Sequence, residues 1–280
     1  MKKSSKFVCG LVALGASSGL ANASVYSTNF TGYTLGDLNG QNGWTSNGAT
    51  ATTGYVQSIA GVWGGRAASI GFVDPVSPAI PYVSHSVSTP MVDTVGNMNA
   101  SFSALFQVQD SDSGYGTTPA EIAAAADRDS FGFRLQNSTG DNLFSFILTP
   151  FAQSATPETT TRFDTYSWST GVGAPTVALA GLAAQENNAY TFTVNFFDAG
   201  AGNVGFNANI NNINYFSGTL AGLSGQTISN LGAFWDTTTG AAGPGSNFMI
   251  FDNVSLIPEP SSALLGLLGA SFAFVRRRRA

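Results

Sequence analysis

The sequence predicts an all-β fold, a sandwich of two antiparallel sheets, and three observations lead to it. Apolar residues alternate with Ser, Thr and Asn over several segments, turn-rich clusters separate these segments, and only 10% of the residues are charged. The alternation has the period of a β-strand, whose successive side chains point to opposite faces. One apolar and one polar face per strand is typical of antiparallel sheets with one side in water. Two such sheets bury their apolar faces by stacking against each other.

Five segments carry the alternation most clearly, and we expect each to form a strand. They are residues 102–108, 131–135, 144–148, 190–196 and 204–210. The clusters between strands are rich in the residues that turns require, namely Asn137–Gly140, Asp198–Asn203 and Thr239–Gly245.

One short helix and a single body domain are expected as well. Thr118–Glu121 forms a capping box with Pro at the first helical position, and an alanine-rich run follows up to Asp127. No linker-like change of composition divides residues 24–256, whose length suits one β-sandwich domain.

Residues 1–23 have the composition of a Sec-type signal peptide. Three lysines in the first six residues precede an apolar run over residues 7–20, which several Gly and Ser residues interrupt. Ala21 and Ala23 form a small-x-small site, so we expect cleavage before Ser24. The short, interrupted run favours a cleaved signal over a transmembrane helix.

The charge and cysteine content of the body exclude several functions. Between residues 24 and 257 there are four basic residues, all Arg, and fifteen acidic ones, a net charge of −11. Nucleic-acid binding needs Lys and Arg to neutralise phosphates, so the body does not bind nucleic acid. The only cysteine, Cys9, lies within the expected signal peptide. The exported protein therefore has no disulfide and no thiolate metal site.

Residues 257–280 differ in pattern from the body. Pro258, Glu259 and Pro260 come first, and we expect the prolines to exclude regular structure there. Fifteen uncharged residues, 261–275, follow. A helix of this length is roughly 22 Å long, shorter than the roughly 30 Å hydrocarbon core. We therefore expect a short C-terminal transmembrane helix, held with its cytoplasmic end at Arg276, Arg277, Arg278 and Arg279.

In this order and spacing, the tail resembles the PEP-CTERM sorting signal of Gram-negative bacteria. The resemblance implies recognition by exosortase, a membrane protease-transpeptidase, with Pro258, Glu259 and Pro260 as the recognition motif and the arginines as the stop. It also implies a transient anchor in the inner membrane, followed by release or transfer to the cell surface or extracellular matrix. An ordinary tail anchor is the alternative.

Two segments of the body support a second resemblance. Phe30–Trp44 and Phe248–Leu256 resemble the first and last strands of concanavalin A-like or laminin-G-like jelly rolls. The resemblance implies carbohydrate or protein binding and, in some branches, polysaccharide cleavage. We therefore expect a lectin-like jelly roll whose partners are extracellular polysaccharide or surface proteins.

The sequence offers little for catalysis, which favours a non-catalytic protein. His85 is the only histidine, and it is in phase with Val83 and Val87 on the apolar side of an expected strand. A structural role is favoured, and a histidine-based metal site is excluded. The Glu-x-Asp-x-x-Glu strand motif that the resemblance implies for glycosidases is absent. Aspartates converging from distant strands leave a secreted glycoside hydrolase or polysaccharide lyase as the alternative.

Several acidic side chains are candidates for special roles. Asp110 and Asp112, before Gly114, resemble part of a Ca²⁺ loop, although Ca²⁺ needs six to eight oxygen ligands and a solvated acidic loop is the alternative. Asp252 falls on the apolar face of its expected strand, which requires either a β-bulge or a buried, hydrogen-bonded carboxylate.

Four aromatic residues are candidates for stacking on sugar rings: Trp44, Tyr55, Trp63 and Trp168. Trp44 and Trp63 lie in Gly-rich segments, where an exposed ring could stack on a sugar, but core packing is favoured for each Trp. Trp235 is in phase with Leu231 and Ala233, so we expect it in the core.

Overall fold

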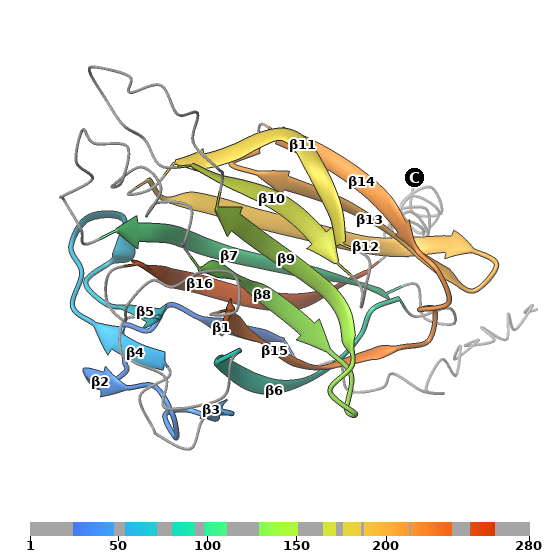
Figure 1. Cartoon of the computed structure of the whole chain (residues 1–280). Helices are drawn as coiled ribbons and strands as arrows, with labels where there is room; N and C mark the ends of the chain where they lie inside the picture. The colour runs from blue at the N-terminus through green and yellow to red at the C-terminus, as the bar shows by residue number, and fades with distance from the viewer. Residues whose placement is uncertain are drawn as a thin grey trace, which may run out of the picture.

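Two antiparallel sheets stacked face to face make up the fold (Figure 1). The structure, a computed structural model, describes residues 25–47, 54–71, 80–92, 98–110, 129–150, 165–171, 176–185, 188–212, 214–236 and 247–260. Every strand pair in this part of the chain is antiparallel. The predicted all-β sandwich of two antiparallel sheets is confirmed.

The larger sheet has nine strands, and it contains both ends of the described chain. Its order is β14 (Asn214–Leu220), β13 (Asn203–Ile210), β12 (Tyr190–Gly200), β7 (Met98–Asp110), β16 (Asn247–Pro260), β5 (Ala67–Ile70), β4 (Gly54–Gln57) and β2 (Gly36–Asp37), with β1 (Tyr26–Thr28) paired to β16.

The smaller sheet has seven strands. Its order is β11 (Thr176–Gln185), β10 (Thr165–Gly171), β9 (Asn142–Pro150), β8 (Ser130–Gln136), β15 (Thr227–Asp236), β6 (Tyr82–Pro90) and β3 (Trp44–Ser46). The one helical segment among the described residues is a single 3₁₀ turn, η2 (Gly61–Trp63). Over the same residues, nothing helical has the length and apolarity needed to span a bilayer.

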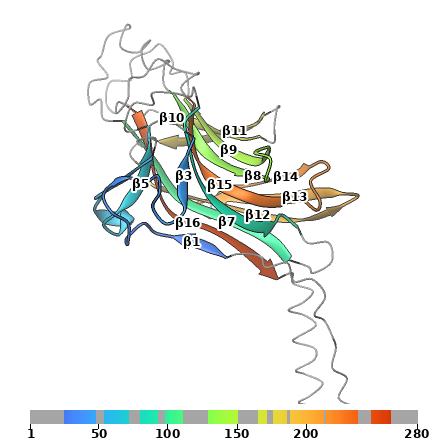
Figure 2. The same ribbon diagram turned by 90° about the horizontal axis from the view of Figure 1, so that it is seen from below.

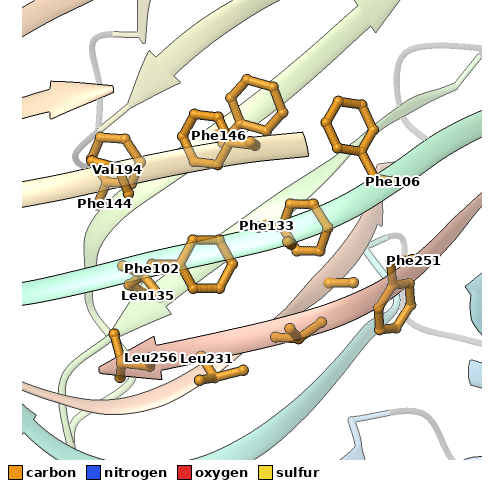
Figure 3. Packing of buried hydrophobic residues seen from close by; sticks show 14 of the residues in the cluster. Phe102, Phe106, Phe133, Leu135, Phe144, Phe146, Val194, Leu231, Phe251 and Leu256 are labelled. Carbon is orange, nitrogen blue, oxygen red and sulfur yellow. The ribbon is translucent and has the colours of Figure 1, made fainter. Parts of the chain in front are cut away.

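Phenylalanine rings from both sheets fill the space between them. Phe146 of β9 stacks on Phe192 of β12, with the ring centroids 4.1 Å apart. The ring centroid of Phe133 of β8 lies 5.7 Å from that of Phe102 and 6.2 Å from that of Phe106, both on β7 (Figure 3). The five segments with predicted alternation are all strands, and their apolar faces enter this core.

The two sheets are curved, so their outer faces differ in shape. Figure 2 shows strands of both sheets bent in the same direction, with β8, β9 and β10 on the inner side of the bend. The outer face of the seven-stranded sheet is therefore the concave face of the molecule.

The predicted turns at Asn137–Gly140 and Asp198–Asn203 connect neighbouring strands. In the first, the side-chain oxygen of Asn137 accepts hydrogen bonds from the backbone N–H groups of Thr139 and Asp141. Gly140 has a φ of 88°, a conformation that glycine adopts without strain. In the second, Gly200 N–H donates to the Asp198 carboxylate. Both turns confirm the prediction made from composition.

A β-bulge explains the position of Asp252. The register between β16 and β7 shifts between Asp252 and Ser255, and Asn253 has a φ of 48°. Val254 and Leu256 consequently face the core, whereas Asp252 faces outward and is still only 2% exposed. Its carboxylate accepts a 2.7 Å hydrogen bond from the Asn253 N–H. Both proposed explanations, bulge and hydrogen-bonded carboxylate, are confirmed.

The prediction that Pro258 and Pro260 exclude regular structure is wrong. Strand β16 continues through Pro260, and Pro258, Glu259 and Pro260 pair with Ala100, Asn99 and Met98 of β7. In the described chain the register with β1 ends at Leu256, so beyond it β16 has a partner on one side only. Proline is tolerated in such edge positions because its missing N–H can face the unpaired side.

Four predictions fall on residues outside the described part of the chain. They are the signal peptide over residues 1–23, the helix over 118–127, the turn at Thr239–Gly245, and the tail from residue 261 with its four arginines.

The inter-sheet packing predicts a large effect of Phe133→Ala. Phe133 is 2% exposed and packs against rings of the opposite, nine-stranded sheet, so its truncation should lower the free energy of unfolding by about 3–5 kcal/mol. Urea denaturation measures this loss. Phe197→Ala is the control, because Phe197 is only half-buried on an outer face, and its loss should be clearly smaller. Equal losses would contradict the described core.

Candidate functional site

The alternation along β8 places an arginine on the concave face. Phe131, Phe133 and Leu135 enter the core, so Gly132 and Arg134 belong to the opposite face of the strand. Arg134 is half-buried. It is the one basic residue within the described strands, since Arg66 precedes β5.

Strands β15 and β6 bring two aromatic side chains to the same face. Leu231, Ala233 and Trp235 of β15 are in the core, so Phe234 faces outward. In register, Phe234 lies opposite Tyr82 of β6 on one side and Gly132 of β8 on the other. Three strands that are far apart in sequence therefore gather Tyr82, Phe234 and Arg134.

A cation–π contact joins two of these side chains. The guanidinium carbon of Arg134 lies 4.0 Å from the centroid of the Phe234 ring. Gly132 makes room for the ring, because a Cβ at this position would lie 2.7 Å from a Phe234 ring carbon. The ring is only 1% exposed although it is outside the main core. The contact holds the guanidinium in place over the sheet.

The charges of this group are set by burial and by its neighbours. Burial lowers the pKa of Arg134, while the nearby Tyr82 and Asp236 act in the opposite direction. A guanidinium keeps its charge at neutral pH even so. Burial raises the pKa of Tyr82, which keeps its hydroxyl neutral. The site thus combines a fixed cation, a neutral phenol and the Asp236 carboxyl group at the end of β15.

Two buried polar atoms at this site have hydrogen-bonding capacity that the described protein does not use. The Tyr82 hydroxyl and the Arg134 Nε are both buried and have no hydrogen-bond partner. Nearly all buried polar atoms in proteins are paired, so such atoms call for an explanation. Both atoms are shielded from solvent in this structure, so a ligand could supply the missing partners only if the neighbouring side chains move aside on binding.

Small residues extend from Arg134 across the sheet. By register, one row across six strands contains Thr45, Ser84, Gly232, Arg134, Ser145 and Gly171. With neighbouring strands about 4.8 Å apart, the row is roughly 24 Å long. The side chains of this row on both sides of Arg134 are small, although Ser145 is only 3% exposed.

A buried carboxyl group lies just before β8. Asp129 is 1% exposed, and one of its oxygens accepts a 2.7 Å hydrogen bond from the indole N–H of Trp235. The other oxygen, Oδ1, is buried without a partner in the described structure. Burial raises the pKa of Asp129 to about 6, the Trp235 hydrogen bond opposes this shift, and Asp236 adds to it. Trp235 is 2% exposed, so its predicted core position is confirmed.

The structure contradicts two of the predicted sugar-stacking residues. Trp44 is 1% exposed and packs on Phe30 and Phe251, with ring centroids 5.7 and 6.0 Å away. Trp63 is 4% exposed and belongs to a second apolar cluster with Phe248. The Gly-rich segments fold their tryptophans inward, so both rings pack in apolar clusters, as the sequence favours, and neither is available for sugar stacking.

The other predicted site residues do not come together. Tyr55 is half-buried in β4 of the nine-stranded sheet, whereas Trp168 pairs with Leu148 in the seven-stranded sheet. Asp110 ends β7, and Asp112 lies outside the described residues. The described residues contain no group of three or more His, Cys, Asp or Glu side chains suited to a metal. The Ca²⁺ site at Asp110 and Asp112 stays a prediction.

His85 is held by packing contacts. Its ring lies on Tyr26 with centroids 4.0 Å apart, and its Nε2 is 3.0 Å from the carbonyl oxygen of Asn42. Nδ1, the atom that an orienting carboxylate would contact in a catalytic triad, is buried and has no partner in the described chain. These contacts agree with the structural role favoured from the sequence.

Sequence reasoning missed Arg134, Phe234 and Tyr82. The phase of each residue is visible in the sequence, because Arg134 alternates with Phe133 and Leu135, and Tyr82 precedes Val83. That β6, β15 and β8 lie side by side is not visible, since it depends on pairing between residues such as Tyr82 and Phe234.

The comparisons with known proteins bear on the fold. No protein-family model matches this chain, and no curated protein matches it. Among solved structures, the chain resembles a mutant of the alginate lyase Aly36B in complex with an alginate trisaccharide, with a TM-score of 0.52, 13% identity, and coverage of 85% of this chain and 99% of that one.

Two further solved structures are more distant. The carbohydrate esterase vb_24B_21 of the Shiga toxin-encoding bacteriophage phi24B has a TM-score of 0.43 and 15% identity, covering 83% of this chain and 98% of that one. The winged bean acidic lectin complexed with methyl-α-D-galactose has a TM-score of 0.45 and 9% identity, with coverages of 84% and 97%. At these identities, and with only the lyase above a TM-score of 0.5 among the three, the likeness concerns the fold: an all-β, jelly-roll-like sandwich.

The two buried aspartates predict how stability depends on pH. Burial raises the pKa of both Asp129 and Asp252 to about 6, from an ordinary value of 3.8. The folded state binds these protons more tightly than the unfolded state. Protonated Asp129 and Asp252 therefore contribute fully to the free energy of unfolding below about pH 4. This contribution is lost as the pH rises to about 6.

Asp129→Asn and Asp252→Asn test this dependence, because asparagine keeps the acceptor oxygen without the charge. Each variant should exceed the wild type by about 1–2 kcal/mol in unfolding free energy at pH 7, and the gain should vanish at pH 4. Asp141→Asn is the control with the opposite sign, since hydrogen bonds from Thr139 and Asn137 lower the pKa of this exposed carboxylate. A gain independent of pH would show that these carboxyl groups titrate normally.

Proposed function

We propose that this is a non-catalytic, exported surface or extracellular-matrix protein, with a lectin-like jelly roll that binds a hydroxyl-rich polysaccharide on its concave face. The observation that carries the proposal is the cluster of Tyr82, Phe234 and Arg134, with its two buried and unpartnered polar atoms.

The chemistry of the site suits a sugar. Sugar hydroxyls both donate and accept hydrogen bonds, while the C–H faces of the rings are apolar. Arg134 only donates, the carboxylate oxygens of Asp236 can accept, and the hydroxyl groups of Tyr82, Ser84 and Thr45 do both. Few convergent polar groups over an otherwise apolar or small-residue surface are typical of small-molecule sites.

The dimensions favour a polymer over a single sugar. The row that contains Arg134 crosses six strands, roughly 24 Å, which is several times the width of one sugar ring. Its members are small, so a chain could lie across the strands and contact Arg134 at its centre. The occupant we propose is an internal segment of an extracellular polysaccharide.

One observation favours the alternative, a glycoside hydrolase or polysaccharide lyase. Asp129 and Asp236 interact electrostatically, and a carboxyl group with a pKa raised to about 6 beside a second one is the pairing that glycosidases use. Asp129 is, however, 1% exposed, and one of its oxygens is held by Trp235. Only the other oxygen is left for acid–base chemistry, and the strand motif that pairs two acids is absent from the sequence, so the non-catalytic function is preferred.

The proposal for localisation rests on the sequence of the two chain ends. A Sec-type signal over residues 1–23 exports the protein, and an exosortase-type membrane protease processes the tail near Pro258–Pro260. In the described structure, the body includes this motif, because β16 pairs with β7 up to Pro260.

Tyr82→Phe tests the binding face with the smallest possible change. The Tyr82 hydroxyl is buried and has no partner in the described protein, so its removal should not lower the melting temperature. If the hydroxyl bonds to the glycan, affinity should fall about three- to ten-fold. A panel of linear polysaccharides in affinity electrophoresis, followed by calorimetry with the best ligand, measures this.

Tyr55→Phe is the matched control, because it removes the same atom from the other sheet. Unchanged affinity in Tyr82→Phe, or a loss confined to Tyr55→Phe, would contradict a site on the concave face. Release of reducing ends or unsaturated products from the same panel, abolished by Asp129→Asn, would establish the enzymatic alternative instead.

The proposed processing predicts the composition of the mature protein. Mass spectrometry of the surface fraction from the native host should find peptides that begin at Ser24, and none from residues 261–280. Peptides that run through residues 261–275 in the surface fraction would contradict exosortase-type processing and leave an ordinary tail anchor.

A further inference from the structure

The edges of the two sheets differ in their capacity to pair with another strand. At one end of each sheet the edge strand is very short: β2 has two residues and β3 has three. At the other ends lie β11 and β14, which Figure 1 shows on the same side of the molecule. The pairing of β11 with β10 has a register shift, whereas β14 pairs with β13 over seven residues without one.

Within the described residues, strand β14 lacks three features that often protect an edge, namely charge, proline and a bulge. Its sequence, Asn214–Leu220, contains no charged residue and no proline, and its register contains no bulge. Natural sheets normally blunt a long edge by one of these means, because unpaired N–H and C=O groups are a template for another strand. A regular, uncharged edge is therefore a candidate interaction surface.

We infer that β14 pairs with β14 of a second copy of this chain, antiparallel and about a two-fold axis at Ser217. In this arrangement Ser217 lies opposite Ser217 of the second copy, and Phe216 lies opposite Gly218. Ser217 and Thr219 are exposed on the outer face, while Phe216 is partly buried against the core. The pairing thus continues the polar face and the apolar face of the sheet from one copy into the other.

The glycine in β14 makes the strand complementary to itself. Within one copy, the ring of Phe206 lies over Gly218, where a Cβ would be 2.7 Å from a ring carbon. Gly218 offers no side chain to oppose Phe216 of the second copy. An aromatic residue of each copy then flanks the same glycine, and aromatic rings placed in this way compensate for a glycine at the edge of a sheet. The absence of charge in β14 also keeps the net negative charge of the body away from the contact.

This pairing has a consequence that rests on the proposed function. A two-fold axis perpendicular to a continuous sheet leaves both concave faces directed to the same side. Two Arg134 sites could then bind one polysaccharide or one matrix, and the second contact would be intramolecular. The pairing itself does not depend on what Arg134 binds.

Cysteine cross-linking tests the pairing directly, since the chain has a single cysteine, Cys9. In a full-length Cys9→Ser background, Ser217→Cys places two thiols across the axis. Residues directly opposite in antiparallel strands have Cα atoms about 4.5–5.5 Å apart, within the range of a disulfide. Mild oxidation at micromolar concentration should convert most of this variant to a covalent dimer.

Asn207→Cys is the matched control. Asn207 is exposed on the same face and opposite Ser217 within one copy, but it is one strand further from the axis. Its thiols would be about 14 Å apart, three strand spacings, so no cross-link should form. Equal cross-linking of the two variants, or none in Ser217→Cys, would overturn the inference.

Light scattering gives a second measurement that does not depend on cysteine. Ser217→Lys places two positive charges opposite each other across the two-fold axis. Their repulsion should weaken self-association at least ten-fold, whereas Asn207→Lys should leave it unchanged. Circular dichroism checks that both variants are folded. A dimer that withstands Ser217→Lys, or a wild type that is monomeric at all concentrations, would overturn the inference even if the polysaccharide site is correct.

Discussion

The structure depends on one constraint: every strand has a single face to offer to the space between the sheets, and large aromatic side chains occupy it. Phe146 and Phe192 meet across that space with centroids 4.1 Å apart, and Phe133 contacts Phe102 and Phe251. Tight aromatic packing of this kind leaves no room for polar groups. Polar chemistry is therefore displaced to the two outer faces, to the loops and to the rim.

The two outer faces use their polar groups differently. On the nine-stranded sheet, neighbouring strands satisfy each other: Ser101 donates a 2.6 Å hydrogen bond to Asn195, and Ser103 and Thr193 lie 3.3 Å apart. On the concave face of the seven-stranded sheet, Tyr82 and Arg134 retain buried polar atoms without partners in the described chain. This contrast, and not the likeness to solved structures, is the reason for placing the binding function on the concave face.

Much of the fold could be predicted from the sequence because strand alternation is a local property. The phase of Phe131, Phe133 and Leu135, the turn at Asn137–Gly140 and the core position of Trp235 all follow from short stretches of chain. Asp252 shows the limit of the pattern. The sequence indicated a bulge or a buried, hydrogen-bonded carboxylate, but only the structure places the bulge at Asn253 and shows which side chains turn outward.

The candidate site could not be predicted because it depends on which strands are neighbours. Trp44 and Trp63 were expected to be exposed if functional, but Phe251 and Phe248, near the other end of the chain, cover them. Arg134 and Tyr82 could not be recognised as site residues from the sequence, because their side chains come together only when β15 lies between β8 and β6. Pro258 and Pro260 were expected outside the sheet, and their place in β16 depends on the single partner β7 at that point.

The claim that the concave face binds polysaccharide is tested most directly by a crystal structure of the protein with an oligosaccharide of its preferred polymer. The account predicts a sugar chain that crosses β6, β15 and β8, with hydroxyl groups within hydrogen-bond distance of the Tyr82 hydroxyl and Arg134 Nε. A chain bound on the nine-stranded sheet, or at the loops with both atoms still unpartnered, would contradict it.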